Sequence, residues 1–157
     1  MDKKLWLKGA AGFSFFMALC QAVVSLSPAA AAYFQAPPEL LENRLQLFLV
    51  GEGATLIFAI FGLYALSGAG SIPHLPLLRL GLIGVSSLYL LRGLFFILTV
   101  LTILGVLEGE ILIQGAISHL VFLAAGIAYA VGTVLNWREM QILRSRKKKV
   151  ADSTPGL

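Results

Sequence analysis

Residues 45–66 read LQLFLVGEGATLIFAIFGLYAL, a run of 22 residues in which Glu52 is the one charged side chain. A helix needs about 20 apolar residues to cross the roughly 30 Å of hydrocarbon in a bilayer. Lipid offers no partner for backbone N–H and C=O groups, so a helix is the structure that satisfies them within one segment. The stretch is therefore predicted to span a membrane as a single helix.

Three further stretches have the same character. They cover residues 5–27, 77–104 and 111–137, and the charged residues within them are Lys8, Arg79 and Arg92. Short alternating segments, which would indicate a β-barrel, do not occur. We predict an all-α polytopic membrane protein. Residues 1–137 form one transmembrane domain, a four-helix bundle, and residues 138–157 form a basic, partly disordered tail.

The composition agrees with this prediction. The chain of 157 residues is 58% hydrophobic and 13% charged, and its mean hydropathy is +0.87. Soluble domains are about 45–50% apolar and about 25% charged. These values exclude a water-soluble enzyme and a disordered chain, and the single cysteine, Cys20, excludes a disulfide scaffold.

The first stretch has a second interpretation. Lys3, Lys4 and Lys8 precede an apolar run that ends in Ser27, Pro28 and four alanines. Charge, apolar core and small residues follow in the same order in a signal peptide. The apolar run is long for a signal peptide, so we expect the helix to be retained, with cleavage as the open alternative.

The distribution of basic residues predicts the orientation. Ten of the 12 lysines and arginines lie before or within the first turns of the first span, at the end of the second loop or in the tail. Lys and Arg stay on the cytoplasmic side of a membrane. Both termini are therefore predicted to be cytoplasmic. The first and third loops, which carry acids, face outward: Glu39, Glu42, Glu108 and Glu110.

A basic cluster occupies the tail directly after the last span. Such clusters attract anionic lipid by about 1 kcal/mol per charge near the surface. We expect it to anchor the topology on lipid headgroups. Nucleic-acid binding is not expected, because no binding fold accompanies the tail. The cluster consists of Arg144, Arg146, Lys147, Lys148 and Lys149.

Glu52 and Arg92 are the most informative residues for function. A charge at bilayer depth costs at least about 2.5–3.5 kcal/mol, so such residues face the bundle interior, pair, or mark a pathway. The two residues lie in neighbouring spans at somewhat different depths. A direct ion pair, a water-bridged pair and separate partners all remain open.

His119 matches Glu52 better in depth, because each lies about eight residues from the outer end of its predicted span. Gln114 lies near the same level. Glu52 and His119 are candidates for sharing a proton or for holding a polar headgroup. The alternative is a structural hydrogen bond between them. Tyr64 and Tyr89, in the cytoplasmic half, are candidates for bonding each other or Arg92.

Other kinds of site find no support. Glu52 and His119 supply two metal ligands where three or four are needed. No GxSxG elbow or phosphate-binding glycine loop occurs. We assign no catalytic residue, metal site or cofactor. An intramembrane enzyme with Glu52 as acid and His119 as base is the least favoured of three hypotheses.

Residues 62–94 resemble a known group. They contain GLYALSGAG (62–70), LPLLR (75–79) and YLLRGL (89–94). These motifs resemble an uncharacterised group of small bacterial four-helix inner-membrane proteins, over about a fifth of the chain. The resemblance implies the bacterial inner (plasma) membrane and no particular activity. A broader likeness to DoxX-type proteins rests on size and span count only.

Two functional hypotheses follow. The first is a non-enzymatic bundle with an internal polar site, which acts as an accessory subunit of a larger membrane protein or binds an apolar small molecule such as a lipid or quinone. The second is a proton-coupled carrier that works as a homodimer, with Glu52 as the titrating group. Membrane lipids are expected partners in both.

Overall fold

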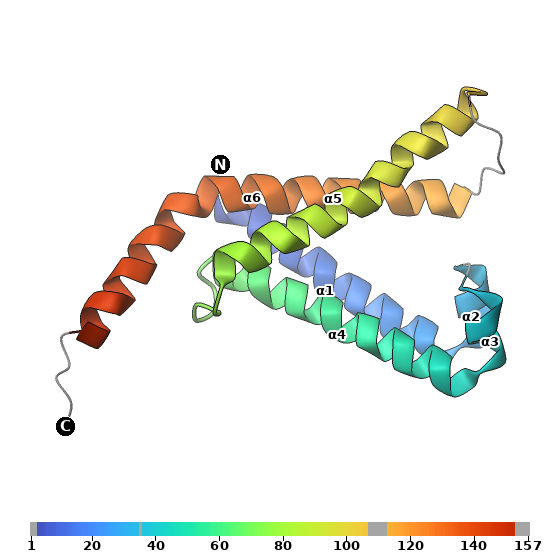
Figure 1. Ribbon diagram of the computed structural model, residues 1–157, viewed down its shortest axis with the longest axis horizontal. Coiled ribbons are helices and arrows are strands. Elements are labelled where there is room, and N and C mark those ends of the chain that lie inside the picture. Colours follow the sequence, from blue (N-terminus) through green and yellow to red (C-terminus); the bar gives the residue numbers. More distant parts are fainter. Residues whose placement is uncertain (1–2, 35, 107–112, 153–157) are drawn as a thin grey trace.

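The computed structural model describes residues 3–34, 36–106 and 113–152, without the side chains of residues 113, 114, 139 and 141–152. Figure 1 shows the arrangement of the chain. This part of the chain contains six helices and no strand: α1 (Lys4–Leu26), α2 (Pro28–Tyr33), α3 (Pro38–Glu42), α4 (Arg44–Gly68), α5 (Leu78–Ile103) and α6 (Ile113–Asp152).

Four of these helices are long and apolar enough to cross a membrane, which confirms the all-α, four-span prediction. The candidate spans are Lys4–Leu26, Arg44–Gly68, Leu78–Ile103 and Gly115–Arg138. Their ends agree with the predicted ends within a few residues. Helix α6 continues past its span to Asp152, so the basic tail begins as a helix.

Local signals in the sequence explain the ends of the first helices. Pro28 follows α1, and Ser27 caps α2 because its Oγ accepts a hydrogen bond from the amide of Ala30. Asn43 caps α4 by accepting from the amides of Leu45 and Gln46. The small-residue run after α1 is thus a short helix that turns the chain back toward α4.

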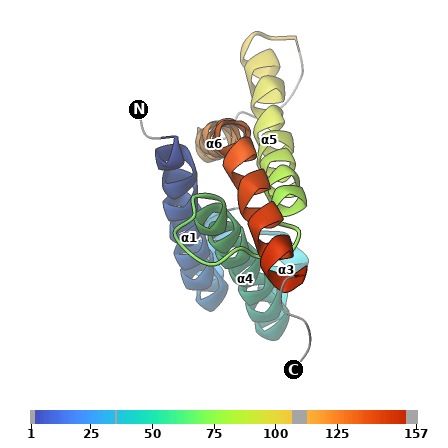
Figure 2. The same ribbon diagram turned by 90° about the vertical axis from the view of Figure 1, so that its left-hand side faces the viewer.

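The four long helices form two antiparallel hairpins. The first hairpin pairs α1 with α4, and the second pairs α5 with α6. Figure 2 shows the two pairs from the end where α1 begins. Glycines allow the backbones of each pair to approach closely. A Cβ on Gly93 would lie 2.5 Å from the Cα of Leu123, and one on Gly126 would lie 2.8 Å from the amide nitrogen of Leu90.

The two hairpins meet at the end of the bundle that holds the start of α1, the 69–77 loop and the last turns of the fourth span (Figure 1). Asn136 of α6 donates a hydrogen bond to the carbonyl of Lys3 there. Arg79 of α5 lies over the Trp137 ring, 4.6 Å from its centroid. Toward α2 and α3 the hairpins diverge, so the bundle is not uniformly closed.

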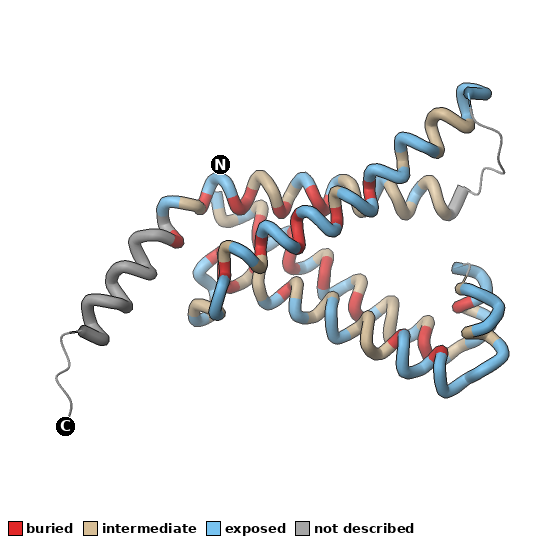
Figure 3. The backbone as a smooth tube through the Cα atoms, in the orientation of Figure 1, coloured by how far each residue is buried: buried red, intermediate tan, exposed pale blue. Residues whose placement is uncertain are grey.

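Burial along the facing surfaces follows this divergence. Val85 and Ile103 lie on the same face of α5, 18 residues or five turns apart. Val85 is 4% exposed and Ile103 is 59% exposed. On α4, Gly68 is buried, whereas Val50 on the same face is 55% exposed. Figure 3 shows one group of buried residues where the hairpins cross and a smaller one among α1, α2 and the start of α4.

We call the part of the bundle around the buried Leu7, Ala65, Leu82 and Val85 the closed half. The open half is the part beyond Tyr89 on α5 and beyond Phe58 on α4, toward α2 and α3. The cluster of buried apolar residues that joins the two hairpins lies in the closed half.

Candidate functional site

The boundary between the two halves is a chain of hydroxyl groups that links all four long helices. The Oγ of Ser14 (α1) lies 3.0 Å from the Tyr89 hydroxyl (α5) and 2.6 Å from the Tyr129 hydroxyl (α6). Tyr129 donates to the Phe61 carbonyl (α4) at 3.0 Å. With each hydroxyl donating once, the direction is Tyr89 to Ser14 to Tyr129 to Phe61, and every proton has an acceptor.

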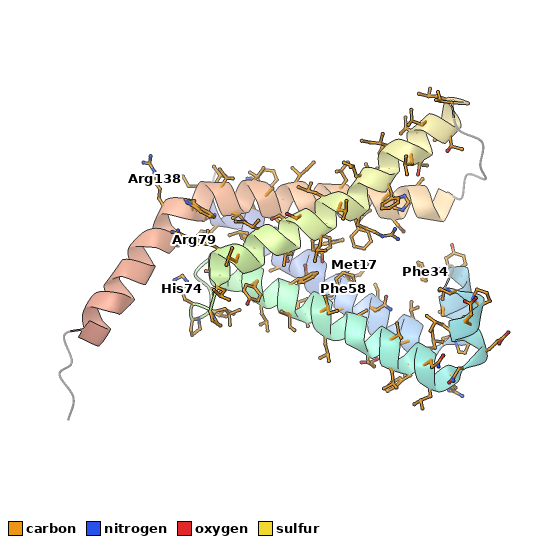
Figure 4. All side chains as sticks on the ribbon, viewed as in Figure 1. Met17, Phe34, Phe58, His74, Arg79 and Arg138 are labelled. Carbon is orange, nitrogen blue, oxygen red and sulfur yellow. The ribbon has the colours of Figure 1, made fainter. Side chains whose placement is uncertain are left out.

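Aromatic rings surround this chain on the side of the open half. Tyr89 stacks on Tyr129 with 5.3 Å between ring centroids, and on Phe122 at 5.6 Å. Phe58 stacks on Phe122 at 6.3 Å, which bridges the two hairpins. Met17 and Phe58 lie where the hairpins begin to diverge (Figure 4). The aromatic cluster therefore forms the floor of the open half.

Arg92 lies just above this floor. It follows Tyr89 by three residues, 14 residues after the start of α5 and 11 before its end, so it is about 16–21 Å from either end of the span. Its guanidinium lies over the Phe122 ring at 5.8 Å from the centroid. The side chain is exposed rather than buried.

His119 of α6 is the hydrogen-bond partner of Arg92, with 3.3 Å between Nη1 and Nε2. Arginine has donors only, so Nε2 accepts and the ring proton is on Nδ1. Nδ1 lies 3.5 Å from Oγ1 of Thr99, which donates to the carbonyl of Phe95. The neutral imidazole is thus oriented by α5 on both of its nitrogens.

Glu52 lies in a different place. Its Oε1 is 2.8 Å from the Oγ of Ser25 on α1, and the same Oγ is 2.8 Å from the Ala22 carbonyl. Ser25 is the donor in both contacts, so its one hydroxyl proton is shared between the Glu52 carboxyl oxygen and the Ala22 carbonyl. Glu52 precedes Phe61 by nine residues, which places it on the opposite side of α4 from the side that meets Tyr89.

The structure therefore gives Glu52 and Arg92 separate partners, one of the three alternatives that the sequence left open. His119 pairs with Arg92 and not with Glu52. Depth along the span was the reason for matching His119 with Glu52, but the face of each helix decides the contact. Among the described residues no carboxylate lies within salt-bridge distance of Arg92.

The remaining candidates are divided. Tyr89 belongs to the hydroxyl chain, whereas Tyr64 donates to the carbonyl of Pro76 at 3.2 Å, far from Arg92 along α5. Neither bonds the other. The side chain of Gln114 and those of the basic cluster in the tail lie outside the described residues.

Three contributors to the site were not among the predicted candidates. Ser14, Thr99 and Tyr129 occur in the stripes of small and polar residues along the spans, at steps of three and four. Such a stripe indicates a helix contact, but it does not tell which hydroxyl meets which. Within the described residues, no group of three or more His, Cys, Asp and Glu side chains is suited to hold a metal.

Comparisons with protein-family models, curated proteins and solved structures found no match for the chain.

Proposed function

We propose that this small integral membrane protein is a non-enzymatic binding protein that holds an apolar, lipid-like molecule between its two hairpins. The observation that carries the proposal is the position of the polar group. Burial on the facing surfaces ends just beyond Tyr89, and Arg92 lies about one turn further along α5, bonded to His119, which Thr99 contacts from further into the open half. An apolar site with a few converging polar groups is the usual form of a small-molecule site.

The composition of the open half supports a ligand with an apolar body. The Phe58 and Phe122 rings form the floor. Phe95 lies 5.9 Å from the His119 ring, centroid to centroid, and is 47% exposed. An acyl chain or a quinone ring can pack against these aromatic rings. Arg92 and His119 would then orient the polar head of the ligand.

The test is native mass spectrometry of the protein extracted with its own lipid, on two matched variants. Thr99→Trp fills the space beside His119. Thr102→Trp places the same ring one turn further along α5, where Thr102 donates to the carbonyl of Leu98 in its own helix. We expect Thr99→Trp to lose most of the retained small molecule and Thr102→Trp to keep it. A protein that retains no small molecule in any form contradicts the proposal.

The same spectra test the partner. A larger protein in the complex would make the chain an accessory subunit that presents its ligand to that partner. A complex of identical chains would instead indicate a homo-oligomer.

A proton-coupled carrier is the second candidate, and Glu52 is the observation that favours it. The glutamate lies at membrane depth on the side of α4 away from the second hairpin, where it accepts a hydrogen bond from Ser25 of α1. Four helices alone enclose only a narrow pathway, so this candidate acts as a homodimer. Flux that survives in Glu52→Gln would contradict this candidate.

The proposed location is the bacterial inner membrane with both termini in the cytoplasm and the basic cluster of the tail on anionic lipid headgroups. The positive-inside rule supports it. Single cysteines at Ser71 and at Ala36, in a Cys20→Ala background, test it through labelling of intact cells with an impermeant thiol reagent. Labelling at Ala36 and protection at Ser71 are expected, and the reverse pattern would overturn the orientation.

A further inference from the structure

Resting on the proposed function, we infer that the molecule held between the hairpins is an acidic amphiphile, whose carboxylate or phosphate head binds Arg92. The structure leaves this guanidinium incompletely used. It has five N–H donors, and within the described part of the chain its hydrogen-bond partner is the imidazole of His119. The other donors are available to an acceptor on a bound molecule.

The charge of Arg92 makes that acceptor an anion. A guanidinium in the middle of a span is stabilised by a counter-charge, because its own charge is poorly solvated there. The partners present are a neutral imidazole and the face of Phe122. A carboxylate or phosphate takes two parallel N–H bonds from an arginine, which a neutral head cannot match.

The described part of the chain does not supply this anion. Glu52 is the one acid within the described spans, and it faces away from the second hairpin and contacts Ser25. Its side of α4 is half a turn from the side that meets Tyr89. The counter-charge is therefore assigned to a molecule that enters the open half.

Arg79, on the same helix, makes similar contacts but lies in a different place. It lies in the first turn of α5, near the end of the span, where it donates to the carbonyl of Trp137 and covers the Trp137 ring. Arg92 repeats the ring contact with Phe122 but lies at the centre of the span. The position of Arg79 near water and its backbone acceptor account for a charged side chain there. Neither accounts for the charge of Arg92 at the centre of the span.

The experiment compares two probes that differ in the head alone. Oleate and oleyl alcohol are titrated separately into delipidated protein in a neutral detergent, and bound probe is counted by native mass spectrometry. We expect oleate to bind about tenfold tighter or more, since hydrogen bonds between charged groups are roughly twice as strong as neutral ones. Arg92→Gln should bring the ratio close to one and leave the affinity for oleyl alcohol within about twofold.

Two further variants control for charge and for fold. Lys8→Gln removes one positive charge from the first span, at the opposite end of the bundle from the open half, and should keep the preference for oleate. Arg92→Lys keeps the charge but not the fork of donors, and should keep part of the preference. Inorganic phosphate is titrated alongside: if it displaces oleate, the source of the anion is a free ion, and if it does not, the source is the lipid.

The outcomes separate the two proposals. Equal binding of oleate and oleyl alcohol to the wild-type protein would overturn the acidic head and leave the lipid-binding function standing. A preference for oleate that survives in Arg92→Gln would also overturn it. Absence of binding for both probes would contradict the proposed function and this inference together.

Discussion

The two halves of the bundle both contain polar side chains among apolar ones, but they differ in how those polar side chains are hydrogen-bonded. At the edge of the closed half, each hydroxyl proton of the hydroxyl chain has an acceptor inside the protein. In the open half, Arg92 keeps unused donors and the apolar residues on the facing surfaces are exposed. Hydrogen bonds within the protein hold the helices together at the hydroxyl chain. The further N–H donors of Arg92 indicate where a ligand is expected.

The close crossing of α5 and α6 should have the largest effect on stability. Gly93→Leu places a side chain against the backbone of Leu123, where a Cβ alone would lie 2.5 Å from the Cα. We expect a loss of about 3 kcal/mol or failure to fold, at the upper end for overpacking. Unfolding in mixed micelles followed by circular dichroism measures it.

The control for this variant is Gly84→Leu on the same helix, because a Cβ on Gly84 meets nothing within 4 Å. Its unfolding midpoint should match that of the wild-type protein. Equal midpoints for the two leucine variants would mean that the α5–α6 crossing does not determine stability.

The hydroxyl chain should contribute less. Tyr129→Phe removes the donor to the Phe61 carbonyl and the acceptor for Ser14. Side-chain hydrogen bonds between membrane helices average about 0.6 kcal/mol, so the loss of two should lower the free energy of unfolding by about 1 kcal/mol. Tyr64→Phe, which removes a bond to a loop carbonyl, should cost less than half as much. Equal destabilisation of the two variants would mean that the hydroxyl chain contributes no more to stability than a bond to a loop.

Arg92 should behave in the opposite way to the residues of the closed half. Arg92→Leu removes a charge from the centre of a span and breaks one bond to His119. We expect the free energy of unfolding to stay the same or to rise by up to about 1 kcal/mol, because groups kept for function often reduce stability. A decrease in the free energy of unfolding by more than about 1 kcal/mol in the same assay would show that Arg92 has a structural role.

Glu52→Gln should change stability least, by under about 0.5 kcal/mol. A glutamine side chain is nearly the same size, and its Oε1 accepts the hydrogen bond from Ser25 in place of the carboxyl oxygen. Unfolding in mixed micelles, as for the other variants, provides the measurement. A clearly larger loss would show that the carboxyl group itself holds α1 against α4.

Much of the architecture was predictable from residue type and spacing. Glu52, Arg92, His119 and Tyr89 were identified as informative because polar groups in long apolar runs are rare. Their partners were not predictable with the same arguments. Depth along a span suggested His119 for Glu52, whereas the faces of the helices pair His119 with Arg92 and Glu52 with Ser25.

The sequence by itself determined the number of spans, their ends and the position of each charge along them. The reason is local, because about 20 apolar residues are needed to cross a layer of given thickness. Pro28 and Pro38 begin helices and Asn43 caps one through properties of their own side chains. Only the tertiary structure decided which faces meet. The crossing at Gly93 and Gly126 and the hydroxyl chain through Ser14 set the rotation of each helix, and that rotation leaves Arg92 beside the open half without an acid.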